Sequence, residues 1–115
     1  ILNADGLRDE KQVWGKATDW CDYSGPLDGR FVGLMVMPHP ENFRRSWFHV
    51  RDYGLLLANP FGRHALTGGE KSAVTVKPGE SLRLRFGVFV HSSPTADAFD
   101  PSAAYRAYLD AAAGE

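Results

Sequence analysis

Four side chains that suit a polar ligand recur at every second position of one short segment. The four are Trp47, His49, Arg51 and Tyr53. Successive side chains of an extended chain point to opposite faces, so these four would share one face while Phe48 and Val50 take the core face. Aromatic rings stack on sugars, and arginine and histidine donate to oxygens. The segment predicts a binding surface for a sugar-like molecule; a solvated sheet face with ordinary cross-strand pairs is the alternative.

Two histidines and one aspartate are the candidate acid–base groups. They are His49, His39, which stands between two prolines, and Asp22. Imidazole carries protons near neutral pH, and a carboxylate beside aromatic rings often marks a site. We expect His49 or His39 to move a proton and Asp22 to orient or accept. A structural salt bridge from Asp22 to an arginine is equally open. No recognised metal-ligand spacing is present, so we assign no metal site.

The remaining predicted binding residues lie beside these groups. Trp20 and Tyr23 flank Asp22 and would form walls of the pocket together with the aromatic residues of 47–53. Asn59 could contact the ligand, although its position before a proline is also typical of a turn.

Other reactive residue types are weaker candidates. Arg83, Arg85 and His91 fall on the polar side of the last expected strand and should be solvated. Cys21 has no histidine motif or helix start beside it that would lower the pKa of its thiol, so a catalytic cysteine is not expected. No phosphate-binding glycine loop, nucleophile elbow or zinc-finger spacing occurs, and the sequence implies no particular cofactor.

Length and charge narrow the class of protein. The chain has 115 residues and a net charge of −1, the size of one small domain. A near-neutral charge without a basic run predicts no nucleic-acid or membrane-surface partner. No apolar run reaches the roughly 18–20 residues that span a bilayer. One cysteine and no signal-peptide pattern indicate a cytoplasmic protein, with export left open.

Short strands separated by glycine and proline turns predict an all-β fold, an antiparallel β-sandwich. The expected strands cover residues 17–23, 31–37, 47–53, 54–58, 72–76 and 81–90, and the expected C-terminal helix covers residues 100–113. Residues 24–30 should connect the first two strands. In the last strand Leu82, Leu84, Phe86, Val88 and Val90 form the predicted apolar face. Residues 31–37 and 55–58 are apolar on both faces and need cover on both sides.

Several motifs occur together in a fixed order. They are Trp20–Gly29, His39-Pro40, His49–Gly54, Ala58–Gly62 and Lys77–Ser81 with a strand ending at His91. In these motifs the chain resembles a bacterial family of unknown function labelled "methane oxygenase PmoA". The resemblance implies the C-terminal half of a longer protein, with an N-terminal-half segment as packed partner, and a relation to the galactose-mutarotase-like supersandwich. Residues 1–115 are thus a single domain or half of a larger β-sandwich domain.

Three functions follow as expectations. The leading one is binding or acid–base processing of a sugar-like small molecule in a concave sheet face. The alternative is a non-catalytic binding or assembly module. A metal-dependent oxygenase, which the family label implies, ranks last because no convincing ligand set is present in the sequence.

Overall fold

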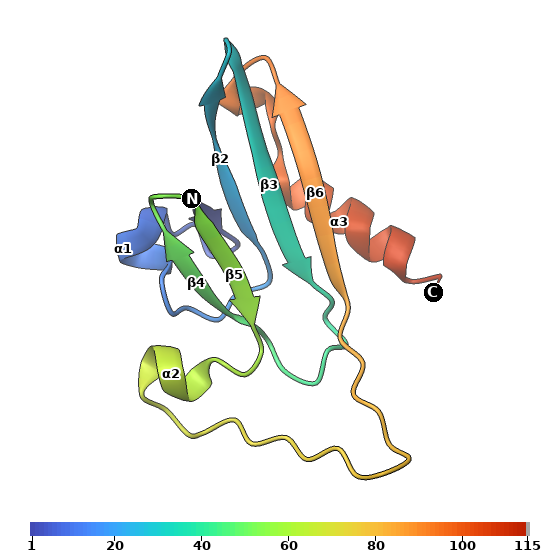
Figure 1. Ribbon diagram of the computed structural model, residues 1–115. Helices are drawn as coiled ribbons and strands as arrows, with labels where there is room; N and C mark the ends of the chain where they lie inside the picture. Colours follow the sequence, from blue (N-terminus) through green and yellow to red (C-terminus); the bar gives the residue numbers. More distant parts are fainter. Residues whose placement is uncertain (115) are drawn as a thin grey trace.

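The computed structural model describes residues 1–114 and is mostly β (Figure 1). Its elements are β1 (Leu2–Asn3), α1 (Asp9–Val13), β2 (Cys21–Leu27), β3 (Arg30–Pro38), β4 (Trp47–Arg51), β5 (Leu55–Asn59), α2 (Arg63–Thr67), β6 (Phe86–Ser93), a 3-10 turn (Ala96–Ala98) and α3 (Pro101–Ala112). One sheet has the order β1-β2-β3-β6, the other pairs β4 with β5, and both are antiparallel. The predicted all-β, sandwich-like class with one C-terminal helix is confirmed.

A tight hairpin joins β2 to β3. Leu27 pairs with Arg30, so the turn is only Asp28-Gly29, and both residues have positive φ, 51° and 77°. Two-residue turns with positive φ at both positions match the twist of a hairpin and favour Asp-Gly. The connection expected over residues 24–30 is therefore shorter than predicted, because Ser24, Gly25 and Pro26 extend β2.

Helix α3 covers one face of the larger sheet. Asp100 caps it by accepting a hydrogen bond from the Ala103 N–H at 3.1 Å, and Pro101 occupies its first position. Tyr108 packs against the cluster of buried residues beneath the helix, and it lies directly over Gly87, where a Cβ would approach its ring to 2.6 Å. A glycine at position 87 therefore brings α3 close to the sheet.

The hairpin β4–β5 packs on the opposite face of the larger sheet (Figure 1). Phe48 and Val50 are fully buried there in a cluster with Cys21 and Val13, as the alternation of residues 47–53 predicts. The strand ends at Arg51, however, and not at residue 53, because residues 52–54 form the turn of the hairpin.

Residues 72–76 and 81–85 do not form the predicted strands. The expected turn between them is present, with the Glu80 N–H donating to the Lys77 carbonyl at 2.9 Å and Gly79 at a φ of 86°. Neither flanking segment lies beside another strand among residues 1–114, so no ladder of hydrogen bonds forms there, and β6 begins only at Phe86. The short helices α1 and α2 were not predicted.

The predicted polarity of β6 is reversed. His91, expected to be solvated, is 7% exposed, whereas Val88 and Val90 are 62% and 72% exposed. The cause is the position of α3, which covers the face of β6 that carries Gly87 and His91. The valines are left on a face that the hairpin covers only in part.

Candidate functional site

Asp22 and His91 form a buried pair although they lie 69 residues apart in the sequence. Asp22 belongs to β2 and His91 to β6, with β3 between them. Nε2 of His91 lies 2.6 Å from Oδ1 of Asp22, and the two side chains are 4% and 3% exposed. An N–H that donates to a carboxylate is about twice as strong a hydrogen bond as one between neutral groups. The pair therefore links two strands that are not neighbours in the sheet.

Gly33 and Phe99 define the space around the imidazole. Gly33 is the register partner of His91 on β3, and a Cβ at this position would lie 2.8 Å from Nε2. The Phe99 ring stacks on the imidazole, with 3.6 Å between centroids and 6° between planes. His91 thus reaches Asp22 across β3 because position 33 has no side chain, and Phe99 covers the ring.

One ring nitrogen of His91 has no partner. Nδ1 is buried and makes no hydrogen bond within the described part of the chain. Because Nε2 donates to Asp22, Nδ1 of a neutral ring carries the lone pair. Buried polar atoms are normally satisfied by protein or by ordered water. The unpaired Nδ1 therefore marks a place where a water molecule or a ligand group is expected.

A cavity of about 520 Å³ opens beside this pair. Its lining includes Asp22, Ser24, Arg8, Asp97, Phe31 and Phe99. Pockets for small molecules typically measure about 300–1,000 Å³ and combine apolar walls with a few polar groups. The bond to His91 uses Oδ1 of Asp22, and the Asp22 side chain lines the cavity. The cavity thus offers acceptors, a guanidinium donor and aromatic surface.

His49 and Arg51 do not join Asp22, contrary to the expected shared surface. Cys21 packs against the β4–β5 hairpin, so its neighbour Asp22 points to the other face of β2. His49 instead lies edge-on to the Trp14 ring at 5.9 Å between centroids, and the Arg51 guanidinium lies 5.3 Å from that ring. Arg51 also pairs with Glu10 at 3.7 Å. This face of β4 is thus packed on the region of α1, and neither residue lines the cavity beside Asp22.

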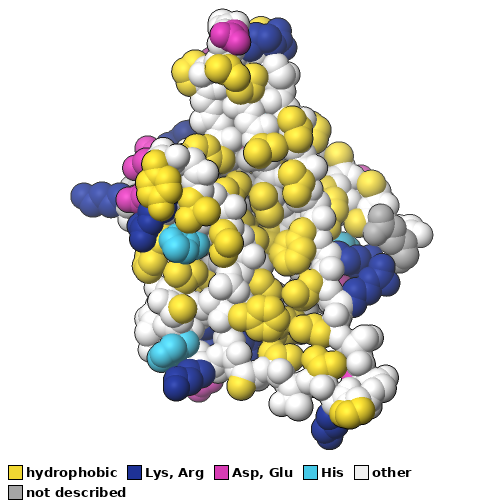
Figure 2. Space-filling view, in the orientation of Figure 1, with side chains coloured by type: hydrophobic (Ala, Val, Ile, Leu, Met, Phe, Trp, Pro, Cys, Tyr) yellow, Lys and Arg dark blue, Asp and Glu magenta, His cyan; other side chains and the backbone are white. Residues whose placement is uncertain are grey.

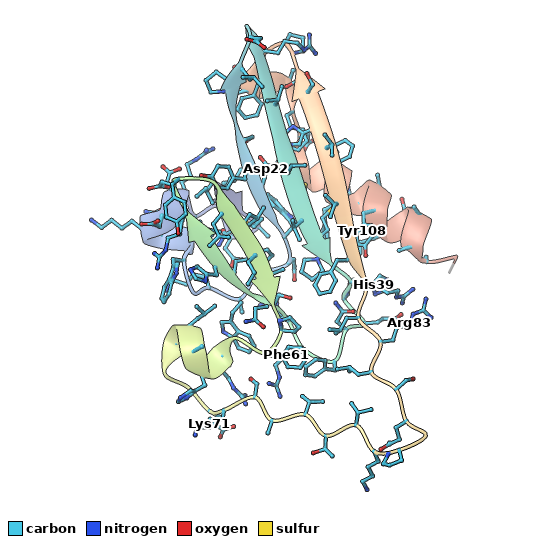
Figure 3. The ribbon with its side chains drawn as sticks, in the orientation of Figure 1. Asp22, His39, Phe61, Lys71, Arg83 and Tyr108 are labelled. Carbon is cyan, nitrogen blue, oxygen red and sulfur yellow. The ribbon has the colours of Figure 1, made fainter. Side chains whose placement is uncertain are left out.

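His39 lies apart from both groups, after the end of β3 (Figure 3). Its Nδ1 accepts a hydrogen bond from the Glu41 N–H at 3.1 Å, and its ring meets the Tyr108 ring edge-on at 6.1 Å. The three candidate acid–base residues are therefore separated, and Asp22 has His91 as its imidazole partner.

Trp20 and Tyr23 are held by contacts inside the protein. Trp20 is 5% exposed and packs in the cluster beneath α3, so it is a core residue. The Tyr23 hydroxyl lies 2.8 and 2.7 Å from the carbonyl oxygens of Arg51 and Asp52. This contact fastens the turn of the β4–β5 hairpin to β2.

The other predicted wall residues lie outside the cavity beside Asp22. Tyr53 is in the hairpin turn and 82% exposed, and Trp47 is half-buried and bridges to Ala17. Oδ1 of Asn59 accepts a hydrogen bond from the Phe61 N–H at 2.9 Å, which is the turn geometry expected of asparagine before proline.

Burial raises the pKa of one buried and one partly buried group. It raises the pKa of the Cys21 thiol to about 12, so the thiolate is absent near neutral pH. Burial also raises the pKa of Tyr105, with the nearby Asp19 acting in the same direction. Neither group is poised for chemistry in its charged form.

Sequence reasoning missed His91 as a site residue because strand alternation placed it with two arginines. One signal was available: Gly33 interrupts the apolar run of β3, and a glycine inside a strand often marks the close approach of another group. Arg8, Asp97 and Phe99 come from connecting segments and carry no pattern of their own.

No group of three or more His, Cys, Asp or Glu side chains within residues 1–114 is arranged to hold a metal ion. Across the same residues, no helix has the length and apolar character needed to cross a membrane.

The fold and the site together define a small β-sandwich-like protein with a buried Asp–His pair beside a cavity. The chain belongs to a family of unknown function, DUF6807, whose model matches residues 1–104. No curated protein and no solved structure matches the chain. The family match covers every residue that lines the cavity.

Proposed function

We propose that the protein binds a neutral, hydroxyl-rich small molecule of the sugar type in the cavity beside Asp22 and His91. The observation that supports this proposal is the buried Asp22–His91 pair, in which Asp22 lines the cavity and His91 has an unpaired Nδ1. Sugar hydroxyls donate well to a carboxylate and accept from a guanidinium such as that of Arg8.

The charges of the cavity favour a neutral ligand over an acidic one. Asp9, Asp22 and Asp97 line it, and Arg8 is its one cationic side chain. A carboxylate ligand would meet three carboxylate side chains for one guanidinium. Phe31 and Phe99 supply the aromatic surface on which the apolar face of a sugar ring stacks.

Acid–base processing is the catalytic form of the same proposal. Asp22 would accept a proton from a ligand hydroxyl, and His91 would hold the carboxylate in place through its Nε2–H. This assigns Asp22 the role expected from the sequence and gives the role of the imidazole partner to His91 instead of His49 or His39.

Ligand titration tests the proposal. A panel of neutral hexoses, pentoses and the matching uronic acids is titrated into the protein by NMR. We expect a neutral sugar to shift signals of Arg8, Asp97 and Phe99. The Asp22→Asn variant should bind about 10–100-fold more weakly, the effect of losing a hydrogen bond to a charged group. Binding of uronic acids alone, or shifts confined to residues outside the cavity, would contradict the proposal.

A pair of surface variants controls for damage to the fold. Arg8→Gln removes the cavity's guanidinium from an exposed side chain, and Arg106→Gln removes one from the exposed side of α3, which does not line the cavity. The first variant should weaken sugar binding several-fold and the second should leave it unchanged. If both variants weaken sugar binding equally, the weaker binding would come from the change in net charge or from lower stability of the protein.

A second function, that of an assembly module, is supported by the uncovered apolar side of the larger sheet. The proposed partner is an N-terminal-half segment of the same family, packed on this side. The described residues offer no group of three or more His, Cys, Asp or Glu side chains that a metal-dependent oxygenase would use as ligands.

A further inference from the structure

The face of the larger sheet that is opposite α3 carries an exposed strip of aliphatic side chains, here called the front strip. Its members are Leu27, Leu34, Val88 and Val90, which are 59%, 48%, 62% and 72% exposed. Figure 2 shows hydrophobic side chains gathered over this side of the molecule. A shallow groove of about 660 Å³ runs along it, lined by Leu27, Val32, Leu34 and Val90 among others. Contiguous exposed apolar surface of this kind marks an interaction site.

The front strip continues an interface that already exists within the chain. On β3, Val36 packs against the cluster beneath the β4–β5 hairpin, whereas Leu34, two residues earlier on the same face, is half exposed. The hairpin thus forms the beginning of a second layer over the sheet, and this layer stops short of the front strip. An occupant of the strip would extend the same layer.

The open edge of β5 shows what kind of element would extend it. On β4, the backbone N–H of Phe48 donates to the Lys16 carbonyl, and the Phe48 carbonyl accepts from the Gly15 N–H. Both backbone groups of Phe48 therefore point away from β5. In an antiparallel pair, residues whose backbone groups bond to the partner strand alternate with residues whose backbone groups point away from it, and two facing residues are always of the same kind. The register pairs Phe48 with Ala58 and Val50 with Leu56, so the N–H and C=O groups of these two β5 residues point outward.

These outward groups of Leu56 and Ala58 make no hydrogen bond to another residue of the described chain. In Figure 1, β5 is the strand of the hairpin that lies nearer to β3 and β6, so its open edge faces the front strip. Open edges of sheets are sites where an additional strand binds. One added strand would therefore satisfy the edge of β5 and cover the front strip at the same time.

We infer that the assembly partner proposed above supplies an extended segment, apolar at every second residue, which pairs with the edge of β5 and lays its apolar side on the front strip; in this choice of partner the inference rests on the proposed assembly function. The alternation follows from the geometry, because side chains on one side of the added strand face the sheet and those on the other side face solvent. The hydrogen bonds to Leu56 and Ala58 fix the position of the segment, and the strip contributes burial. This inference is independent of the proposed sugar site, which lies on the opposite face of the sheet.

The test uses an eight-residue synthetic peptide that alternates valine and threonine and has a lysine at each end. It is added to the whole chain, and amide exchange and methyl shifts are followed by NMR. We expect at least tenfold slower exchange of the Leu56 and Ala58 amides and shifts of the Leu34, Val88 and Val90 methyl groups. A peptide of the same composition with its valines in one block should bind at least tenfold more weakly.

Matched lysine substitutions complete the test. Val90→Lys on the front strip should weaken peptide binding at least tenfold, whereas Val76→Lys, at an exposed position of the segment before β6, should leave it unchanged. Methyl shifts without slower exchange at Leu56 and Ala58 would overturn the pairing with β5. A concentration-dependent dimer of the whole chain that excludes the peptide would overturn the proposed partner and make a second copy the occupant.

Discussion

His91 extends across β3 and places its Nε2 2.6 Å from Oδ1 of Asp22, which joins the two strands that flank β3. Three features accompany the contact. Gly33 has no side chain in the path of His91, the Phe99 ring covers the imidazole, and Asp22 points away from the β4–β5 hairpin. Each feature can be tested separately.

The pair should contribute strongly to stability only while both partners are present. Removing one partner leaves the other as a buried polar group without its hydrogen bond, which typically costs about 1–3 kcal/mol and more when that group is charged. We expect Asp22→Leu and His91→Phe each to lower the free energy of unfolding by an amount in this range, measured by urea titration. The double variant should lose clearly less free energy of unfolding than the two single variants lose together. Additive losses would show that the two side chains do not interact.

Gly33→Ala should disrupt the pair by steric overlap alone. The new Cβ would lie 2.6 Å from Ser24 Cβ, 2.7 Å from the Tyr23 carbonyl oxygen and 2.8 Å from His91 Nε2. Overpacking of this kind costs about 1–3 kcal/mol. Gly25→Ala is the matched control, because it lies on β2 with nothing within 4 Å of the new Cβ. Thermal unfolding of both variants provides the comparison, and equal stability of the two would contradict the described contact.

Sequence and structure agree where one residue type or one pattern is decisive. Phe48 and Val50 had to be buried once the segment was a strand, and Asp28-Gly29 and Asp100-Pro101 determine a turn and a helix start locally. The face of β6 could not be predicted this way, because alternation divides a strand into two faces but does not state which one α3 will cover.

The site was only half predictable for the same reason. Asp22 was recognised by its carboxylate among aromatic residues, but its partner depends on the order of strands in the sheet. His91 and Asp22 come together because β6 pairs with β3 in the register that sets Gly33 opposite His91. The predicted association of Asp22 with His49 failed because Cys21, next to Asp22, takes the hairpin side of β2.

The Tyr23 hydroxyl should stabilise the β4–β5 hairpin. It is hydrogen-bonded to backbone carbonyls of Arg51 and Asp52, and a typical hydrogen bond contributes about 0.5–1.5 kcal/mol. Tyr23→Phe should lower the free energy of unfolding by that amount. Tyr53→Phe, at a side chain that is 82% exposed, should have no measurable effect. A loss of the same size in both variants would assign the effect to something other than this contact.

Stability should fall at alkaline pH because of Cys21. Burial raises the pKa of its thiol from 9.0 to about 12, so above pH 9 the unfolded chain releases a proton that the folded chain retains. The contribution of the thiol to stability is therefore complete below pH 9 and is lost as the pH rises toward 12. A tenfold change in an acid dissociation constant corresponds to about 1.4 kcal/mol, so the loss is large enough to measure.

The Cys21→Ala variant isolates this effect. Its stability relative to the unaltered protein is measured by urea unfolding at pH 7 and at pH 10.5. The gap between the two proteins should narrow by roughly 2 kcal/mol at the higher pH. A gap that is the same at both values would show that the thiol ionises as easily in the folded protein as in the unfolded chain.

The most direct test of the Asp22–His91 site is a long-range ¹H–¹⁵N NMR spectrum of the histidine rings, recorded without and with the neutral sugar that binds best. The pair as described, with Nε2 donating to Asp22, has a proton on Nε2 of His91 in the free protein, and the proposed function requires the His91 ring signals and the Asp22 carboxyl signal to shift on binding. A free protein with the proton on Nδ1, or a sugar that binds while both signals stay unchanged, would contradict the proposed site.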